Sequence, residues 1–298
     1  MTESGSEWRI HAIDGSLDAF DKTEEREWRA PFVFIQSADT QLGMIDDYFK
    51  NPNPNWDKEI QLTEEAVRRA NAMTPKPRFF IVCGDLVNAM PGHPDKRPQI
   101  RDFKKCFRHL DRDIPLVCVC GNHDVGDTPT QQSIDEYRKD FGDDYFSWVC
   151  GGVLFVVLNS QYFKDITHVQ ELARKQSQWL DTVLEEYKRS QYKHIVVFQH
   201  IPWFLKEADE EDDYFNVEKE LRLRLLDQLY GAGVRYIFTG HYHRNAGGFY
   251  KDMELVVTSA VGAQLGTDKS GLRVVRVYEN SIQHKYYAID EIPLDIEI

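Results

Sequence analysis

The chain has 298 residues, of which 42% are hydrophobic and 29% are charged. This is enough apolar material for a sizeable buried core, which excludes global disorder. With 49 acidic against 36 basic side chains, the formal net charge is −13. A phosphate backbone or an anionic membrane surface is therefore repelled on average, and nucleic acid is not an expected partner.

Neither a membrane span nor a secretion signal is expected. No apolar run approaches the roughly 20 residues that cross a bilayer, and residues 1–30 are acidic and lack the apolar stretch of a signal peptide. The five cysteines have neither the spacing of a metal site nor that of a disulfide framework. We therefore expect a cytoplasmic protein with reduced thiols and no membrane partner, and we leave its oligomeric state open.

The first half of the chain alternates predicted strands with predicted helices. Apolar, β-rich runs occupy residues 32–38, 78–83 and 116–120. Between them, apolar residues recur at helical spacing over residues 60–73 and 99–110. Each strand ends in polar residues, and in open α/β sheets ligands bind just beyond the carboxyl ends of strands. The βαβαβ order therefore predicts a functional edge where these strands end.

The second half continues the sheet. A tight turn at Gly151-Gly152 predicts a hairpin of residues 145–150 and 153–159. Composition stays even after residue 30, which favours one domain over residues 31–298 behind a mobile acidic extension over residues 1–30. The other predicted elements are a long amphipathic helix, a strand, an acidic loop, a helix, a strand and three antiparallel-like β runs, at residues 169–188, 195–198, 207–213, 217–230, 234–239, 254–259, 272–278 and 283–289.

Side chains that bind metals follow five of the predicted strands. They are Asp39, Asp85, Asn122, His200, and His241 with His243. Oxygen donors mixed with imidazoles suit a catalytic Mn, Fe or Zn ion better than Ca²⁺ or a four-thiolate zinc site. In an extended chain, His241 and His243 point to one side, and the same holds for Asp39 and Gln41.

In this order, the motifs resemble the signature of the calcineurin-like metallophosphoesterases. The motifs are Asp39-x-Gln41, Gly84-Asp85, Gly121-Asn122-His123-Asp124, His200 and Gly240-His241-x-His243. The resemblance implies an α/β fold, a four-layer αββα sandwich of two mixed sheets packed face to face and flanked by helices. The Asp-x-Gln variant with this length is most similar to a subgroup whose assigned activity is serine/threonine phosphoprotein dephosphorylation.

The resemblance also implies a dinuclear centre that holds two divalent cations, drawn from Mn, Fe, Zn and Mg. In such sites the cations, about 3.5–4 Å apart, clamp the phosphoryl oxygens and activate a bridging hydroxide for in-line attack on phosphorus. His123 would protonate the leaving oxygen or stabilise its charge, while Asp124 would fix the tautomer and orientation of the ring. The implied ligands are Asp85 for both metals, Asp39, His243 and Gln41 for one, and Asn122, His200 and His241 for the other.

Two departures from the wider family are visible. Gln41 stands where the family usually has a histidine, which affects the first metal site. The stretch 84–90 lacks the arginine with which calcineurin and type 1 phosphatases clamp phosphate. Arg244, directly after the histidine pair, is a candidate substrate-binding replacement.

We predict a metal-dependent phosphomonoesterase that acts on phosphoserine or phosphothreonine in proteins, or on a small phosphoester. Two alternatives stay open, a phosphodiesterase of small molecules such as cyclic nucleotides and a non-catalytic scaffold on the same fold. The acidic loop 207–213 is either simply solvated, or it overhangs the metal edge and favours basic phosphopeptides. Trp203 and Phe204 either pack in the core or form an aromatic wall for substrate.

Overall fold

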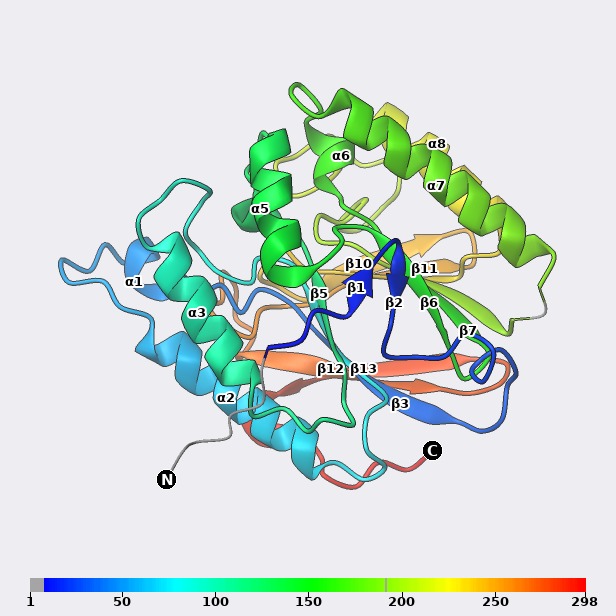
Figure 1. Cartoon of the computed structure of the whole chain (residues 1–298), viewed down its shortest axis with the longest axis horizontal. Coiled ribbons are helices and arrows are strands. Elements are labelled where there is room, and N and C mark those ends of the chain that lie inside the picture. The colour runs from blue at the N-terminus through cyan, green and yellow to red at the C-terminus, as the bar shows by residue number, and fades with distance from the viewer. Residues whose placement is uncertain (1–7, 191) are drawn as a thin grey trace.

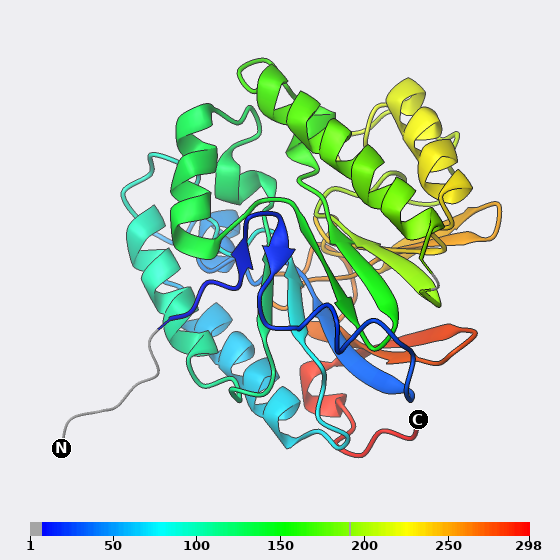
Figure 2. The ribbon, with the colours of Figure 1, turned by 45° about the vertical axis from the view of Figure 1, so that its right-hand side comes forward.

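The computed structural model describes residues 8–190 and 192–298. Two β-sheets pack face to face, and helices cover both outer faces (Figures 1 and 2). The predicted four-layer αββα sandwich of two mixed sheets is thereby confirmed. In the part of the chain that the structure describes, no helix has both the length and the apolar character needed to cross a bilayer.

One sheet has five strands in the order β13-β12-β3-β4-β5. Their bounds are β3 (Phe32–Ser37), β4 (Phe80–Cys83), β5 (Leu116–Val119), β12 (Gly271–Val277) and β13 (Ile282–Ala288). The first three strands are parallel, as their βαβαβ order predicts. Strand β12 is antiparallel to β3, and β13 is antiparallel to β12. The last strands of the chain therefore complete the sheet that the first half begins.

The other sheet has eight strands in the order β1-β2-β6-β7-β8-β9-β11-β10. Their bounds are β1 (Ala12–Ile13), β2 (Ser16–Leu17), β6 (Phe146–Cys150), β7 (Val153–Val157), β8 (His194–Phe198), β9 (Tyr236–Thr239), β10 (Ala246–Tyr250) and β11 (Met253–Val257). The predicted β6-β7 hairpin is confirmed. Of the three β runs predicted as antiparallel-like, β12 and β13 are antiparallel. Strand β11 departs from the prediction, because it runs parallel to β9 and antiparallel to the edge strand β10.

Two pairs of long helices form the outer layers. Helices α2 (Asp57–Ala72) and α3 (Lys96–Phe107) cover the five-stranded sheet, and α7 (Gln170–Lys188) and α8 (Lys219–Gly231) cover the other sheet (Figure 2). All four were predicted with slightly different bounds. The sequence analysis missed five shorter elements: α1 (Met44–Tyr48), α4 (Asn122–Val125), α5 (Gln131–Phe141), α6 (Gln161–Lys164) and the 3-10 helix η1 (Ile289–Glu291).

Alternation along the strands divides the apolar side chains between the layers. In β7, Phe155 faces the other sheet, whereas its neighbours Leu154 and Val156 face the helices. A strand places successive side chains on opposite faces, so a continuous apolar run is what a sheet covered on both sides requires. At the centre between the sheets, Phe79 stacks on Phe34 with ring centroids 4.6 Å apart.

Residues 8–30, predicted as a mobile extension, pack on the sandwich. They contribute β1 and β2 to the eight-stranded sheet, and the Trp8 indole donates a hydrogen bond to the carbonyl of Asp140 at 3.1 Å. Leu17 is buried between the sheets. Residues 1–7 lie outside the described residues, and the division of the chain at residue 30 stays a prediction.

Phe79→Ala tests the packing between the sheets. The ring is fully buried and lies against Phe155 and Trp148 at centroid distances of 5.0 and 5.3 Å, so its removal leaves a cavity. We expect the free energy of unfolding, measured in urea, to fall by about 3–5 kcal/mol. Phe49→Ala is the matched control: that ring is 75% exposed, and we expect a change within about 0.5 kcal/mol. Equal losses in both variants would contradict the central position of Phe79.

Candidate metal centre

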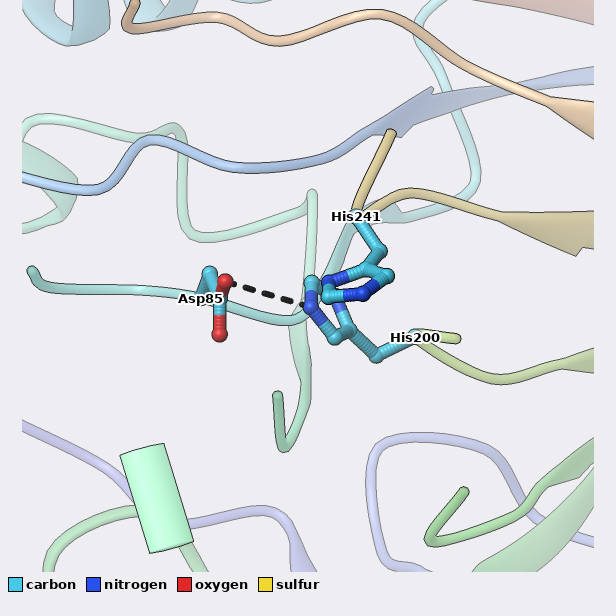
Figure 3. Close-up of side chains that lie close together, drawn as sticks. All are labelled: Asp85, His200 and His241. Carbon is cyan, nitrogen blue, oxygen red and sulfur yellow. Dashed lines mark ion pairs between the residues drawn. The ribbon is translucent and has the colours of Figure 1, made fainter. Parts of the chain in front are cut away.

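The strand ends predicted from the sequence meet where the carboxyl ends of the parallel strands of both sheets lie together. Two groups of side chains there have their ligand atoms within 4.8 Å of one another, Asp85 with His200 and His241, and Asp39 with Asp85 and His243. Asp85 belongs to both groups. Figure 3 shows the first group, with the Asp85 carboxylate facing the imidazole of His200 and His241 beside it. The arrangement of two donor sets around one shared carboxylate is that of a dinuclear site.

The donor atoms of these side chains lie close together and away from solvent. His200 Nε2 is 3.2 Å from Asp85 Oδ2 and 3.1 Å from the side-chain oxygen of Asn122. His243 Nε2 is 3.3 Å from Asp39 Oδ1. All five of these side chains are buried. Asn122 thus lies in the group around His200, where the family resemblance places it.

The imidazoles are oriented by hydrogen bonds on their outer nitrogens. The Nδ1 of His200 lies 2.8 Å from the carbonyl of Cys83, and the Nδ1 of His243 lies 2.6 Å from that of Ala263. A carbonyl accepts, so each Nδ1 donates to it and each Nε2 is the nitrogen that faces the cluster. Metal-ligating histidines are held by such outer partners in most sites.

Two buried atoms of the site have no hydrogen-bond partner among the described residues. They are Nε2 of His241 and Oε1 of Gln41. A buried acceptor without a partner carries a desolvation cost, and a bound cation removes that cost. Together with the carboxylates, these two atoms show that the donor set fits divalent cations. Gln41 also donates from Nε2 to Asn88 Oδ1 at 3.2 Å, which fixes its amide.

The backbone is left-handed at five of the predicted ligands, an uncommon conformation for residues other than glycine. The φ angles are 51° at Asp39, 36° at Gln41, 49° at Asp85, 70° at His241 and 52° at His243. The expectation that Asp39 with Gln41 and His241 with His243 lie in extended chain is therefore wrong. Each strand turns sharply where it ends, and such strain persists only where the surroundings enforce it.

Two glycines of the motifs are required by space. A Cβ on Gly84 would lie 2.3 Å from Nδ1 of His200, and one on Gly121 would lie 2.2 Å from Oδ1 of Asp85. Both distances are far below contact distance. The glycines of the Gly-Asp and Gly-Asn-His-Asp motifs thus let neighbouring strand ends approach closely enough for their donors to meet.

The charges of the site compensate one another. Burial alone would raise the pKa of Asp85, but the nearby His200 and His123 outweigh this and lower it. Burial alone would lower the pKa of His200, but the Asp85 carboxylate raises it to about 9. Burial and the neighbouring His200 lower the pKa of His241 well below its usual value, so this ring is neutral and keeps a lone pair for a cation.

His123 and Asp124 lie beside the cluster, with contacts that differ from the prediction. The ring Nδ1 of His123 is hydrogen-bonded to the carbonyl of Asn88, so it is this carbonyl that sets the tautomer. The Asp124 carboxylate instead accepts from the backbone N–H groups of Gly121 and Leu86, at 2.8 and 3.1 Å. The expected role of Asp124 in orienting the ring is corrected: it holds the backbone turn that presents His123.

Of the three residues suggested for substrate contact, two lie in the core. Trp203 and Phe204 are fully buried beneath the helices of the eight-stranded sheet, so an aromatic wall made by them is wrong. The guanidinium of Arg244 lies over the ring of Tyr242 at 4.7 Å and donates to the carbonyl of the same residue. Its role in binding substrate stays a prediction.

Sequence reasoning missed two aromatic side chains that do lie at the site. The rings of Tyr214 and Phe215 lie 5.1 and 5.4 Å from that of His241. They directly follow the acidic loop 207–213, and no motif marks them. The one available signal was their position just after an acidic loop that itself follows the strand ending at His200.

Part of the acidic loop holds its own backbone in place. The Glu210 carboxylate accepts from the N–H groups of Leu205 and Lys206 at 2.7 and 2.9 Å. Asp212 accepts from the N–H of Lys219 at 2.8 Å. Glu207, Asp209, Glu211, Asp212 and Asp213 are exposed, so most of the loop's charge faces solvent.

Comparison with known proteins agrees with this geometry. A human protein named serine/threonine-protein phosphatase CPPED1 is 49% identical over 282 residues, covering 93% of this chain and 90% of the human one. The zebrafish protein of the same name is 46% identical, covering 95% and 93%. A solved dimetal phosphatase from Danio rerio has the same fold, with a TM-score of 0.62 at 17% identity, covering 88% of this chain and 98% of that one. Residues 32–245 match the calcineurin-like phosphoesterase family, and the chain belongs to that family.

Proposed function

We propose that this protein is a dinuclear metal-dependent phosphomonoesterase that dephosphorylates serine and threonine residues of proteins. The observation that carries the proposal is the shared carboxylate of Asp85 between two buried donor sets. The names of its relatives support the choice of substrate.

Seven residues would hold the cations. One set is Asp39, Gln41 and His243, the other is Asn122, His200 and His241, and Asp85 serves both. When bound, two divalent cations act as Lewis acids on phosphoryl oxygens and lower the pKa of water. The donor set suits Mn, Fe, Zn or Mg, and Gln41 replaces an imidazole by a neutral amide oxygen in the first set.

The proposed acid is Nε2 of His123. Because Nδ1 donates to the carbonyl of Asn88, a second proton on this ring is held at Nε2, the nitrogen free to reach a substrate. The backbone N–H of His123 donates to Asp85 Oδ1 at 2.8 Å, which ties the ring's position to the shared carboxylate. Lys96 supports the same residue by donating to its carbonyl at 2.9 Å. The transferred proton neutralises the serine or threonine oxygen as it leaves.

A cytoplasmic site of action is part of the proposal. All five cysteines are free thiols buried in the structure. Burial raises the pKa of Cys118 and Cys150 far above the usual range, so these thiols stay protonated and unreactive. They act as small apolar side chains of the core rather than as a redox device.

Removal and return of metal should change stability. We expect chelator-stripped protein to melt at a lower temperature than protein titrated with Mn²⁺, because a ligand that binds only the folded state at 100 times its Kd adds about 2.7 kcal/mol per site. His241→Ala should reduce the Mn²⁺ stoichiometry measured by calorimetry from two to one. A melting temperature that does not change on addition of Mn²⁺, Zn²⁺ or Mg²⁺ would contradict the proposed centre.

His123→Ala tests the proposed acid. With metal bound, we expect the kcat on a phosphoserine peptide to fall by about 10²–10⁴-fold. The loss on p-nitrophenyl phosphate should be smaller, because that leaving group needs little protonation. Metal stoichiometry should not change. His109→Ala, on an exposed histidine, is the control. If His123→Ala lowered kcat equally on both substrates, the result would argue against the role of His123 as the acid.

Substitution of three exposed acids of the loop tests whether the loop makes the enzyme prefer basic phosphopeptides. The triple variant Glu207→Gln, Asp209→Asn and Glu211→Gln removes charges whose loss leaves the backbone contacts of Glu210 and Asp212 in place. We expect it to raise kcat/KM on an acidic phosphopeptide, and to do so less at high salt. An equal effect on acidic and basic phosphopeptides would contradict the preference.

A further inference from the structure

We propose that Asp127 and Tyr214 are positioning residues that hold the amide of Asn122 with its oxygen toward the metal centre. The inference rests on the proposed function, because it assigns both residues a role at the same centre. Neither residue is a proposed ligand, and both act through Asn122.

The Asn122 side chain is held from both ends. Its Oδ1 lies 3.1 Å from Nε2 of His200, inside the cluster of donors. Its Nδ2 donates to Oδ1 of Asp127 at 3.0 Å and to the hydroxyl of Tyr214 at 3.2 Å. Asn122 and these two partners form a triangle in which both partners accept from the donor end of the amide.

The triangle decides which end of the amide faces the cations. The oxygen and the NH₂ group of an asparagine have nearly the same shape, so hydrogen bonds rather than packing select the orientation. Only the oxygen carries lone pairs that a cation accepts. A turned amide would bring its oxygen against the Asp127 carboxylate and its hydrogens toward the centre. Asp127 therefore opposes the orientation that cannot bind metal.

Tyr214 is presented by a braced segment, the arm formed by residues 207–216. Lys164 donates to the carbonyls of Asp213 and Asn216, at 2.8 and 2.6 Å, one on each side of the two aromatic residues. The fully buried guanidinium of Arg222 donates to four further carbonyls. Two are in the arm, at Ala208 (2.8 Å) and Glu210, and two lie outside it, at Val217 (3.0 Å) and Trp203 (3.3 Å).

Asp127 is braced as well. Gln161 donates from Nε2 to the carbonyls of Gly126 and Asp127, at 3.1 and 3.2 Å. The neighbouring Thr128 hydroxyl donates to Asp165 at 2.7 Å. The two partners of Asn122 thus belong to different segments, and each segment is held by its own buried donor, Arg222 in one and Gln161 in the other. A side chain held this way from two sides keeps one orientation, as positioning requires.

Metal affinity is the measurement that tests the inference. Chelator-stripped wild type, Asp127→Ala and Tyr214→Phe are titrated calorimetrically with Mn²⁺, and in parallel with Zn²⁺. We expect Asp127→Ala to weaken one of the two sites by about 10–100-fold and leave the other unchanged. Tyr214→Phe keeps the ring and removes one hydrogen bond, so we expect a loss of about fivefold at the same site. Melting temperatures of the metal-free variants should match wild type within about 2 °C.

Two further variants separate positioning from charge and from structure. Asp209→Ala removes an exposed carboxylate of the arm and should leave both affinities unchanged. In Asn122→Asp, two carboxylates face each other across the triangle, and adding Asp127→Asn restores a donor to that contact. We expect the double variant to bind Mn²⁺ more tightly than Asn122→Asp alone, whereas a merely structural Asp127 predicts no such rescue.

The outcomes distinguish this inference from the function on which it rests. Wild type that binds neither metal overturns both. Wild type that binds two ions, with Asp127→Ala and Tyr214→Phe binding them equally well, overturns only the positioning role. Weakening by Asp209→Ala to the same extent as Asp127→Ala also overturns it, because general charge then explains the loss.

Discussion

The site depends on one buried carboxylate. Asp85 follows β4, which lies between β3 and β5 in the five-stranded sheet, and the other sheet brings His200 and His241 over it. An isolated carboxylate in such a place would be costly to ionise. Here the His200 imidazole and the His123 N–H stabilise its charge. The five-stranded sheet therefore supplies the carboxylate, and the eight-stranded sheet supplies an imidazole that stabilises its charge.

Much of this arrangement followed from the sequence. Long apolar runs predict strands covered on both faces, and the polar residues directly after them predict a common edge, because parallel strands end on the same side. The shared position of Asp85 came from the family resemblance. Its surroundings then supplied a physical reason, since each of the two donor sets combines side chains that follow strands of both sheets.

The remainder depends on contacts between distant segments. The extended chain expected at His241 and His243 was wrong, because a hydrogen bond from the N–H of His241 to Asp39, 3.0 Å long, accompanies a sharp turn that no local pattern announces. The His123 ring is hydrogen-bonded to the backbone carbonyl of Asn88. Every residue has such a carbonyl, so the sequence does not mark this partner. Helix α5 could have been predicted, since Ile134, Tyr137 and Phe141 have helical spacing behind a capping Thr130.

The order of strands in the five-stranded sheet has a consequence for biosynthesis. Strand β3, which leads to Asp39, lies between β4 and β12, and β12 comes from residues 271–277. During translation, β3 has only one neighbour until nearly the whole chain has been made. Its free edge is then open to pairing with other strands, and such edges promote aggregation. The five-stranded sheet thus keeps an unpaired edge at β3 until residues 271–277 have been made and β12 covers it.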